Sequence, residues 1–342
     1  MADFDDIEKR TPKVDLEDFS IATLPENKKK NRYYDILAND DTRVKLTSET
    51  YINANYIFQG RMIACQAPKF ETVPDFLEMI MEQEIPIVIQ LTRCTEKGRR
   101  KADPYWGYKE EGGKKVFGKY VVNTIDTLYE DVLEENYKED IQIRYLQIVS
   151  DEGGYSFIQI HYMGWPDYGV PADPHDVLDL VYMHLILGNT EKFSNRNLVT
   201  VHCSAGVGRT GVYCLVSRIV EMVTYQILEK EEMYSSIRPI TSSPKVREVE
   251  DKLEEILIDH PTLTYEDCEA LLPEFVLAMR SERAKMVQTK EQYEYLIESV
   301  ATFFDECLNT IAEYYEPTDA LTPLLKESHA QDFLDFIQRN QF

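Results

Sequence analysis

Residues 201–211 read Val-His-Cys-Ser-Ala-Gly-Val-Gly-Arg-Thr-Gly, and this segment constrains the fold more than any other part of the 342-residue chain. Residues 198–201 predict a short buried strand before it, and residues 211–229 predict a helix after it. A glycine-rich turn between a strand and a helix N-terminus brings backbone N–H groups together, which favours a bound anion. The segment therefore predicts an α/β fold with an anion-binding loop at the end of a buried strand.

The loop carries a cysteine where the predicted strand ends and an arginine six residues later, Cys203 and Arg209. N–H groups that bind a phosphate also stabilise a thiolate, so we expect the pKa of Cys203 to be lowered to ~4–6. The Arg209 guanidinium can hold two phosphoryl oxygens at once. A Cys-x5-Arg spacing also arises in a glycine-rich turn with an incidental cysteine, but the longer string around it argues against that alternative.

Strand and helix patterns alternate along the rest of the chain. Residues 85–91 form a compact apolar run, and residues 116–125 and 141–149 alternate at period two, as half-buried strands do. The pair Gly153-Gly154 predicts a hairpin, and residues 176–187 have helical spacing. Mixed strands and helices of this kind indicate an α/β fold.

The second half of the chain is predicted to be helical. Ser243-Pro244 is typical of a helix start, and an apolar stripe follows it at Val246, Val249, Leu253 and Ile256. Thr264 and Asp267 resemble a capping box at the start of a further helix. These stripes could serve as core, lid or partner face, and core is the favoured interpretation. Residues 290–342 are predicted to be helical, with breaks at two prolines.

The charge balance limits the partners of the chain. It has 37 Lys and Arg against 61 Asp and Glu, a formal net charge of −24. Nucleic acids and anionic membranes attract positive surfaces, so we expect neither as a partner. We find no stretch near the ~18 apolar residues of a membrane span, no signal peptide at the acidic N-terminus and no CxxC pair among the six cysteines. We therefore expect a cytoplasmic protein.

The string His-Cys-Ser-Ala-Gly-x-Gly-Arg-Thr-Gly at 202–211 closely resembles the tyrosine-specific branch of the protein tyrosine phosphatase family. Other segments resemble that family in the same order: residues 31–36 its phosphotyrosine-recognition loop, residues 51–57 a structural strand, residues 165–171 its mobile Trp-Pro-Asp loop and residues 286–292 its Q-loop. The resemblance implies a hydrolase that removes phosphate from phosphotyrosine in protein substrates and acts in signal transduction.

The resemblance covers residues of about 28–228 and 273–300. It implies one phosphatase domain at 28–342, with a twisted mixed β-sheet flanked by helices, and an N-terminal arm at 1–27. Residues 229–272 stand where the family has a shorter connection, so they look like a helical insertion.

The resemblance also implies a two-step reaction that needs no metal and no organic cofactor. Cys203 attacks the phosphorus, Arg209 binds the phosphoryl oxygens, and Asp167 donates a proton to the leaving tyrosine oxygen. Gln288 then positions the water that hydrolyses the cysteinyl phosphate, with Asp167 as the base and Gln292 as a helper. The loop residues that bind the phosphoryl group are Ser204, Ala205, Gly206, Val207 and Gly208.

Supporting roles follow from the same resemblance. His202 tunes the thiolate, and the hydroxyl of Thr210 donates a hydrogen bond to the departing sulfur. Glu96 orients the catalytic arginine, with Lys101 beside it. The remaining supporting residues, Trp165 and Pro166, hinge and anchor the mobile loop.

Substrate recognition is expected to fall to Tyr33, which stacks on the substrate ring, and Asp35, which accepts hydrogen bonds from the substrate backbone. A wall made by Tyr33 deepens the pocket and disfavours phosphoserine. Tyr34 stands where the family is often basic, which weakens any preference for acidic flanking residues. The alternatives are an inactive phosphotyrosine-binding module, a dual-specificity or lipid phosphatase, and a docking protein that binds partners through residues 229–272.

Overall fold

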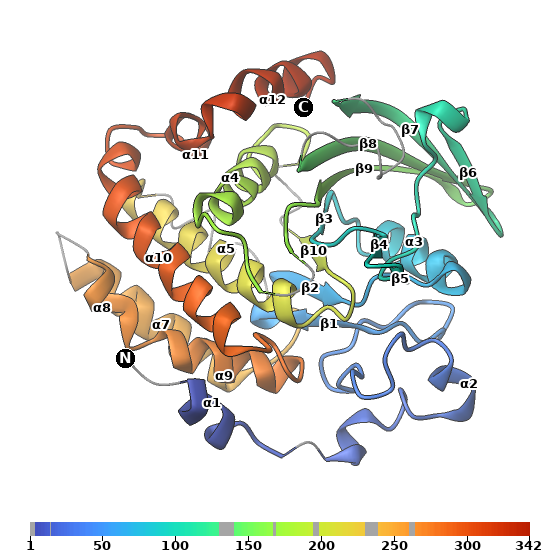
Figure 1. The fold of residues 1–342 in the computed structure, drawn as a ribbon, viewed down its shortest axis with the longest axis horizontal. Coiled ribbons are helices and arrows are strands. Elements are labelled where there is room, and N and C mark those ends of the chain that lie inside the picture. The colour runs from blue at the N-terminus through green and yellow to red at the C-terminus, as the bar shows by residue number, and fades with distance from the viewer. Residues whose placement is uncertain are drawn as a thin grey trace.

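The computed structural model describes residues 4–13, 15–129, 140–166, 169–193, 198–229, 239–259 and 264–342. Within these ranges, eight strands form one mixed sheet in the order β1-β2-β10-β3-β9-β8-β7-β6 (Figure 1). The central pairs β2–β10, β10–β3 and β3–β9 are parallel, and the outer pairs are antiparallel. The strands are β1 Ala54–Ile57, β2 Met62–Cys65, β3 Ile87–Gln90, β6 Lys114–Phe117, β7 Tyr120–Leu128, β8 Ile141–Ser150, β9 Gly153–Tyr162 and β10 Val199–His202.

Helices cover both faces of this sheet. The α-helices are α1 Phe4–Arg10, α2 Pro25–Lys28, α3 Val73–Glu82, α4 His175–Gly188, α5 Gly208–Ile227, α7 Pro244–Asp259, α8 Tyr265–Glu269, α9 Leu272–Glu282, α10 Lys290–Ile311, α11 Pro317–Leu321 and α12 Glu327–Arg339. Short 3-10 turns include η2 Phe58–Gly60 and η6 Thr322–Leu324, and a small hairpin joins β4 Thr95–Glu96 to β5 Arg99–Arg100. The α/β fold predicted from the sequence is confirmed.

Alternation along the central strands divides the core in two. On β3, Ile87 and Ile89 face the cluster formed with α4, α5, α9 and α10, whereas Val88 faces the cluster formed with α3. A strand that is buried on both faces reads as a continuous apolar run. Burial on both faces explains the compact apolar run predicted at residues 85–91. The neighbouring strand β10 lies inside the sheet, between β2 and β3.

Two sequence predictions need correction. The alternation at residues 116–125 predicts a single strand. In the structure, the chain turns at Gly118, which has a φ of +57°, and forms the hairpin of β6 and β7. The helix after the loop begins at Gly208 rather than at residue 211. The polar Arg209 and Thr210 in its first turn hid that start, because the apolar period begins only after them.

The predicted helical segment at 229–272 packs into the body of the protein where the structure describes it. Val246, Val249 and Leu253 of α7 are buried, so the core interpretation of the stripe is confirmed for these three residues. Arg218 of α5 is 1% exposed and donates a 2.7 Å hydrogen bond to Glu250 of α7. The capping box of Thr264 and Asp267 is present at the start of α8.

Both described ends of the chain dock on the helical layer. Helix α1 lies against α9, where Arg10 pairs with Glu274 at 2.7 Å. The segment that leads into α12 lies over α4, as Figure 1 shows at the red end of the chain. There, the carboxylate of Asp179 on α4 is 1% exposed and accepts hydrogen bonds from the backbone N–H of Lys326 and from His329, at 3.0 and 2.6 Å.

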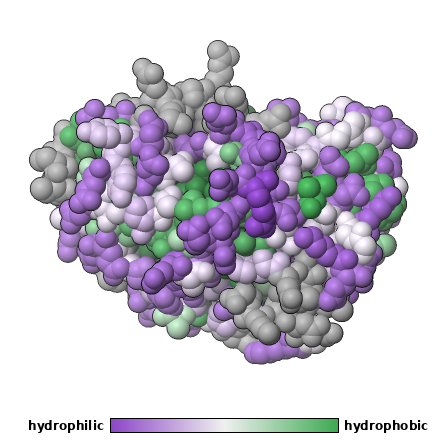
Figure 2. Space-filling model, turned by 90° about the horizontal axis from the view of Figure 1, so that it is seen from above, coloured by the Kyte–Doolittle hydropathy of each residue, from purple (hydrophilic) through white to green (hydrophobic). Residues whose placement is uncertain are grey.

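The face of the molecule seen from above is mainly hydrophilic, with hydrophobic residues exposed in small separate areas (Figure 2). This fits the net charge of −24, which keeps such a surface soluble. Among the described residues, no helix is both long and apolar enough to cross a membrane.

Candidate active site

The loop from Cys203 to Val207 connects β10 to the N-terminus of α5, in the middle of the sheet. Gly206 has a φ of +73°, and a Cβ there would lie 1.9 Å from the carbonyl oxygen of Cys65. A glycine is therefore required at this position by both backbone conformation and space. The tight turn lets the N–H of Gly206 donate to the Cys203 Sγ at 3.3 Å.

The thiol of Cys203 lies in this cradle and is 5% exposed. Burial alone raises its pKa, but the Thr210 hydroxyl, the charge of Arg209 and the N–H groups of Thr210 and Gly206 together outweigh burial and lower the pKa below its ordinary value. The predicted direction of this shift is confirmed. By contrast, burial raises the pKa of Cys65, in the neighbouring strand, to about 12.

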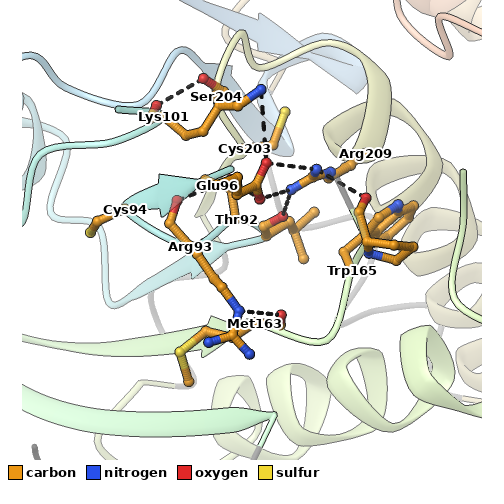
Figure 3. Close-up of polar contacts among 12 residues, drawn as sticks. Thr92, Arg93, Cys94, Glu96, Lys101, Met163, Trp165, Cys203, Ser204 and Arg209 are labelled. Carbon is orange, nitrogen blue, oxygen red and sulfur yellow. Dashed lines mark hydrogen bonds and ion pairs between the residues drawn. The ribbon is translucent and has the colours of Figure 1, made fainter. Parts of the chain in front are cut away.

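Arg209 is held by two carboxylate oxygens at once. Its Nη1 and Nη2 donate to the Oε1 and Oε2 of Glu96 at 2.7 and 3.1 Å, and Nη1 also donates to the carbonyl of Leu91 at 3.0 Å (Figure 3). Glu96 is 7% exposed and accepts from the Thr92 hydroxyl at 2.7 Å, and the Lys101 ammonium lies 3.8 Å from it. The fork of the arginine is thus fixed from behind, as predicted for Glu96.

The same arginine contacts the Trp-Pro-Asp segment. Its Nη2 donates to the carbonyl of Pro166 at 3.1 Å. Trp165 is 3% exposed, and its indole N–H donates across the loop to the carbonyl of Gly169 at 3.3 Å. Both predicted anchors therefore lie beside the anion loop, whereas Asp167 lies outside the described residues.

His202 is buried directly before the nucleophile. Its Nδ1 donates to the carbonyl of Cys203 at 3.1 Å, and its Nε2 accepts from the Tyr105 hydroxyl at 3.1 Å. Burial lowers the pKa of His202 to about 4, so the ring is neutral near pH 7. His202 therefore contacts the loop through the carbonyl of Cys203.

The recognition segment reaches the loop through one hydroxyl contact. The Tyr33 and Ser204 hydroxyls lie 2.8 Å apart, and that of Ser204 donates to the carbonyl of Lys101 at 2.8 Å, so Tyr33 is the donor between them. Tyr34 is 92% exposed. The Asp35 carboxylate is bonded to the Lys285 ammonium at 2.8 Å, which lowers the pKa of that carboxyl.

The Q-loop segment packs against the other side of the anion loop. The N–H of Val287 donates to the carbonyl of Val207 at 3.1 Å, and a Cβ at Gly208 would lie 2.8 Å from the amide of Gln292. Gln288 is exposed, and its N–H donates to the Gln292 Oε1 at 2.9 Å. Gln288 also lines a cavity of about 400 Å³ between the N-terminal segment and α9.

Sequence reasoning missed a fully buried arginine beneath the loop. Arg283 donates to the carbonyls of Gly206 and Ala205 at 2.8 and 3.0 Å, and to the Oδ1 atoms of Asn55 and Asn53 at 2.7 and 2.8 Å. Because Arg283 is 0% exposed, these bonds hold two loop carbonyls toward the interior of the protein. The two asparagines alternate at period two within an otherwise apolar strand segment, and that signal could have identified this face.

No group of three or more His, Cys, Asp or Glu side chains is arranged to hold a metal ion in the part of the chain that the structure describes. A thiol of lowered pKa in a cradle of N–H groups, with a fixed arginine fork beside it, defines a site of the cysteine-dependent phosphatase class.

Comparison with known proteins agrees with this class. The family model "Protein-tyrosine phosphatase" matches residues 27–242. Receptor-type tyrosine-protein phosphatase C of Mus musculus is 37% identical over 65% of this chain and 17% of its own length, and tyrosine-protein phosphatase non-receptor type 4 of Homo sapiens is 32% identical over 90% and 28%. The catalytic domain of human protein tyrosine phosphatase non-receptor type 18 superposes with a TM-score of 0.63 at 30% identity, covering 88% of this chain and 94% of that one.

The chain belongs to the protein-tyrosine phosphatase family. It spans between 14% and 58% of the lengths of the first curated relatives that it matches, and the human non-receptor type 18 enzyme is covered over 55% of its length.

Proposed function

We propose that this chain hydrolyses phosphotyrosine in proteins through a cysteinyl-phosphate intermediate on Cys203. The observation that carries the proposal is the pairing of this thiol, which has a lowered pKa, with an Arg209 fork that Glu96 fixes at 2.7 and 3.1 Å. Such preorganised donors stabilise charge that spreads over the phosphoryl oxygens in the transition state.

In the first step, the Cys203 thiolate attacks the phosphorus in line with the leaving tyrosine oxygen. Arg209 and the loop N–H groups bind the equatorial oxygens, and Asp167 supplies the proton that the leaving oxygen needs. The bond from Arg209 to the carbonyl of Pro166 supports this role for Asp167, because it holds the preceding residue at the edge of the cradle.

In the second step, Gln288 positions a water molecule and Asp167 accepts its proton, while the phosphorus–sulfur bond breaks. The hydroxyl of Thr210, in the first turn of α5, is buried and has no hydrogen-bond partner among the described residues, so it is available to the returning thiolate. The 3.1 Å bond from the N–H of Val287 to the carbonyl of Val207 keeps the Q-loop against the anion loop, and the contact of Gln292 with the N–H of Gln288 holds the Q-loop itself in shape.

The substrate class follows from the recognition segment. Tyr33 is joined to the loop through Ser204, so it forms a wall beside the phosphate position. A phenyl phosphate reaches past such a wall, whereas a phosphoserine stem is shorter. A structurally similar protein, PTPN18, has been solved in complex with HER2-pY1196 phosphopeptides, at a TM-score of 0.66 and 29% identity, which supports phosphotyrosine proteins as substrates.

We also propose that residues 28–342 form one catalytic domain in which residues 229–272 are a helical insertion, and that the protein acts in cytoplasmic signal transduction. The buried bond between Arg218 and Glu250 supports a docked insertion over a free arm. All six cysteines are free, which supports a reducing compartment.

The test uses Cys203→Ser and Asp167→Ala with a phosphotyrosine peptide and the matching phosphoserine peptide. Cys203→Ser is expected to bind the first peptide without turnover, and Asp167→Ala to turn it over slowly and retain it. Cys268→Ser, a buried cysteine on α8, serves as the control and is expected to keep normal turnover. Normal turnover by Cys203→Ser, or equal turnover of the two peptides by the unsubstituted chain, would exclude the proposal.

A further inference from the structure

A row of buried polar side chains crosses the sheet and ends at the nucleophile. Its members are Arg144 on β8, Gln159 on β9, Tyr105, and His202 on β10, and each of them is 0% exposed. They come from segments far apart in the sequence. Buried polar groups of this kind stabilise a structure only when every donor meets an acceptor. The donor in each hydrogen bond of the row can therefore be assigned from its neighbours.

The directions in this row are fixed from the Arg144 end. Arg144 can only donate, so its Nη1 donates to the Gln159 Oε1 at 3.1 Å. The amide nitrogen of Gln159 then donates to the Tyr105 hydroxyl at 2.9 Å and to the Gln90 Oε1 at 3.0 Å. Because the Tyr105 oxygen accepts from Gln159, its own proton points to the Nε2 of His202, 3.1 Å away.

Both ionisable members in the middle of the row keep the proton that this direction needs. Burial raises the pKa of Tyr105 well above its ordinary value, so the hydroxyl stays protonated. Since a carbonyl can only accept, the 3.1 Å contact from the His202 Nδ1 to the carbonyl of Cys203 places the ring proton on Nδ1. The Nε2 of the neutral ring is then free to accept from Tyr105.

We propose that Gln159 is a positioning residue of the active site, which orients the Tyr105 hydroxyl so that a one-way chain of hydrogen bonds from Arg144 holds the peptide of Cys203 in place. A trans peptide carries its C=O and N–H on opposite sides. Holding the Cys203 carbonyl toward His202 therefore turns the N–H of Ser204 away from it, toward the centre of the anion loop. The aligned dipoles carry the positive end of the chain toward the thiolate.

The key variant is Gln159→Glu, which keeps the size of the side chain and its contact with Arg144 but can no longer donate. The Tyr105 proton then turns to the carboxylate, and His202 loses its donor. Tyr105→Phe removes the same link without adding charge, and the double variant separates the two effects. Thr200→Val is the matched control, because Thr200 is buried on β10 and its hydroxyl has no partner within the described residues.

The readout is the pH dependence of Cys203 alkylation by iodoacetamide, followed by mass spectrometry of the peptide that contains Cys203. We expect Gln159→Glu and Tyr105→Phe each to raise the midpoint by about one pH unit. The double variant is expected to equal Tyr105→Phe, and Thr200→Val to match the unsubstituted chain.

Two results would overturn this inference and leave the proposed function standing. The first is an unchanged midpoint in folded Gln159→Glu and Tyr105→Phe. The second is additive shifts in the double variant, which would mean that the new charge acts directly through space. If Gln159→Glu fails to fold, Gln159→Met, which has a similar size and cannot donate to Tyr105, takes its place with the same expected shift. The inference rests on the proposed function through Cys203. An ordinary free-thiol midpoint in the unsubstituted chain would overturn both, so the two failures are distinguishable.

Discussion

Glu96 shows how much one side chain contributes to the arginine fork. It is buried and accepts two hydrogen bonds from Arg209 and one from Thr92. It also forms an ion pair with Lys101. Without it, the guanidinium keeps single contacts to the carbonyls of Leu91 and Pro166 and is free to rotate. Preorganisation of the fork therefore depends on this carboxylate.

We predict that Glu96→Gln lowers kcat/KM for a phosphotyrosine peptide by about 10- to 100-fold, which corresponds to the ~1.5–3 kcal/mol of a hydrogen bond to a charged group. Steady-state kinetics would measure the loss, and Glu110→Gln, an exposed residue, is the control. If Glu96→Gln retained full kcat/KM, the fork would be fixed by its carbonyl contacts instead.

We propose that Lys285 competes with the substrate backbone for the Asp35 carboxylate. The Lys285 ammonium donates to the Asp35 carboxylate at 2.8 Å, and the backbone of Lys285 has a φ of +65°. We predict that Lys285→Met lowers KM two- to three-fold for a phosphotyrosine peptide without acidic residues, because a partly exposed pair is worth only ~0.2–1 kcal/mol. A small aryl phosphate, which lacks a backbone, should keep its KM.

The control for this prediction is Lys290→Met, since Lys290 is equally a surface lysine but pairs with Glu294 on α10. An unchanged peptide KM in Lys285→Met, or the same change with the aryl phosphate, would show that the ion pair does not compete with the substrate backbone.

At the level of elements, the sequence predicted those whose signal is local. The anion loop, the strands at 85–91 and 141–149, and the helix starting at Pro244 all rest on neighbouring residues and match the structure. The missed features depend on contacts between distant segments. Arg283 and Gln159 look like ordinary polar residues in sequence; only the fold brings Arg283 beneath the loop and joins Gln159 to Tyr105. Roles for Cys203 and Arg209 could be predicted because both lie in one short string.

The contact between α5 and α7 allows a test of the docked insertion. Arg218 is buried and donates to Glu250 on α7 and to Glu221 on its own helix, each at 2.7 Å. We predict that Glu250→Ala destabilises the protein by ~2–4 kcal/mol, because it removes one partner of a buried charge. Urea unfolding would measure this free energy of unfolding.

Glu248→Ala on the same helix is the matched control. Glu248 pairs with Lys252 on the exposed face of α7, so its removal should change the unfolding midpoint little. Equal midpoints for the two variants would indicate that α7 is not held by the buried pair.

At the scale of the whole molecule, stability should depend on one buried acid. Glu282 is 1% exposed and accepts N–H bonds from Phe58 and Gln59 at 2.7 and 3.1 Å, where α9 meets the turn after β1. Burial raises its pKa to about 8 from an ordinary value of 4.5. An acid with a raised pKa in the folded state stabilises the fold below pH 4.5, and this contribution is lost as the pH rises toward 8.

We therefore predict that Glu282→Gln, which stays neutral, shows a flatter dependence of Tm on pH between about 5 and 8 than the unsubstituted chain. Thermal unfolding at several pH values would measure the difference, with Glu274→Gln on the surface of α9 as the control. Parallel curves for the Glu282→Gln variant and the unsubstituted chain would contradict the prediction.

The covering of α4 by the last segment has a practical consequence for anyone who shortens this protein. A version that stops after Ile311 would remove the Lys326 amide and the His329 ring, which donate hydrogen bonds to the Asp179 carboxylate, and would uncover the face of α4 on which this carboxylate is buried. Boundaries drawn from the matched family region alone, residues 27–242, would also cut away Arg283 and the Q-loop. Recombinant versions should therefore retain the chain at least through α12.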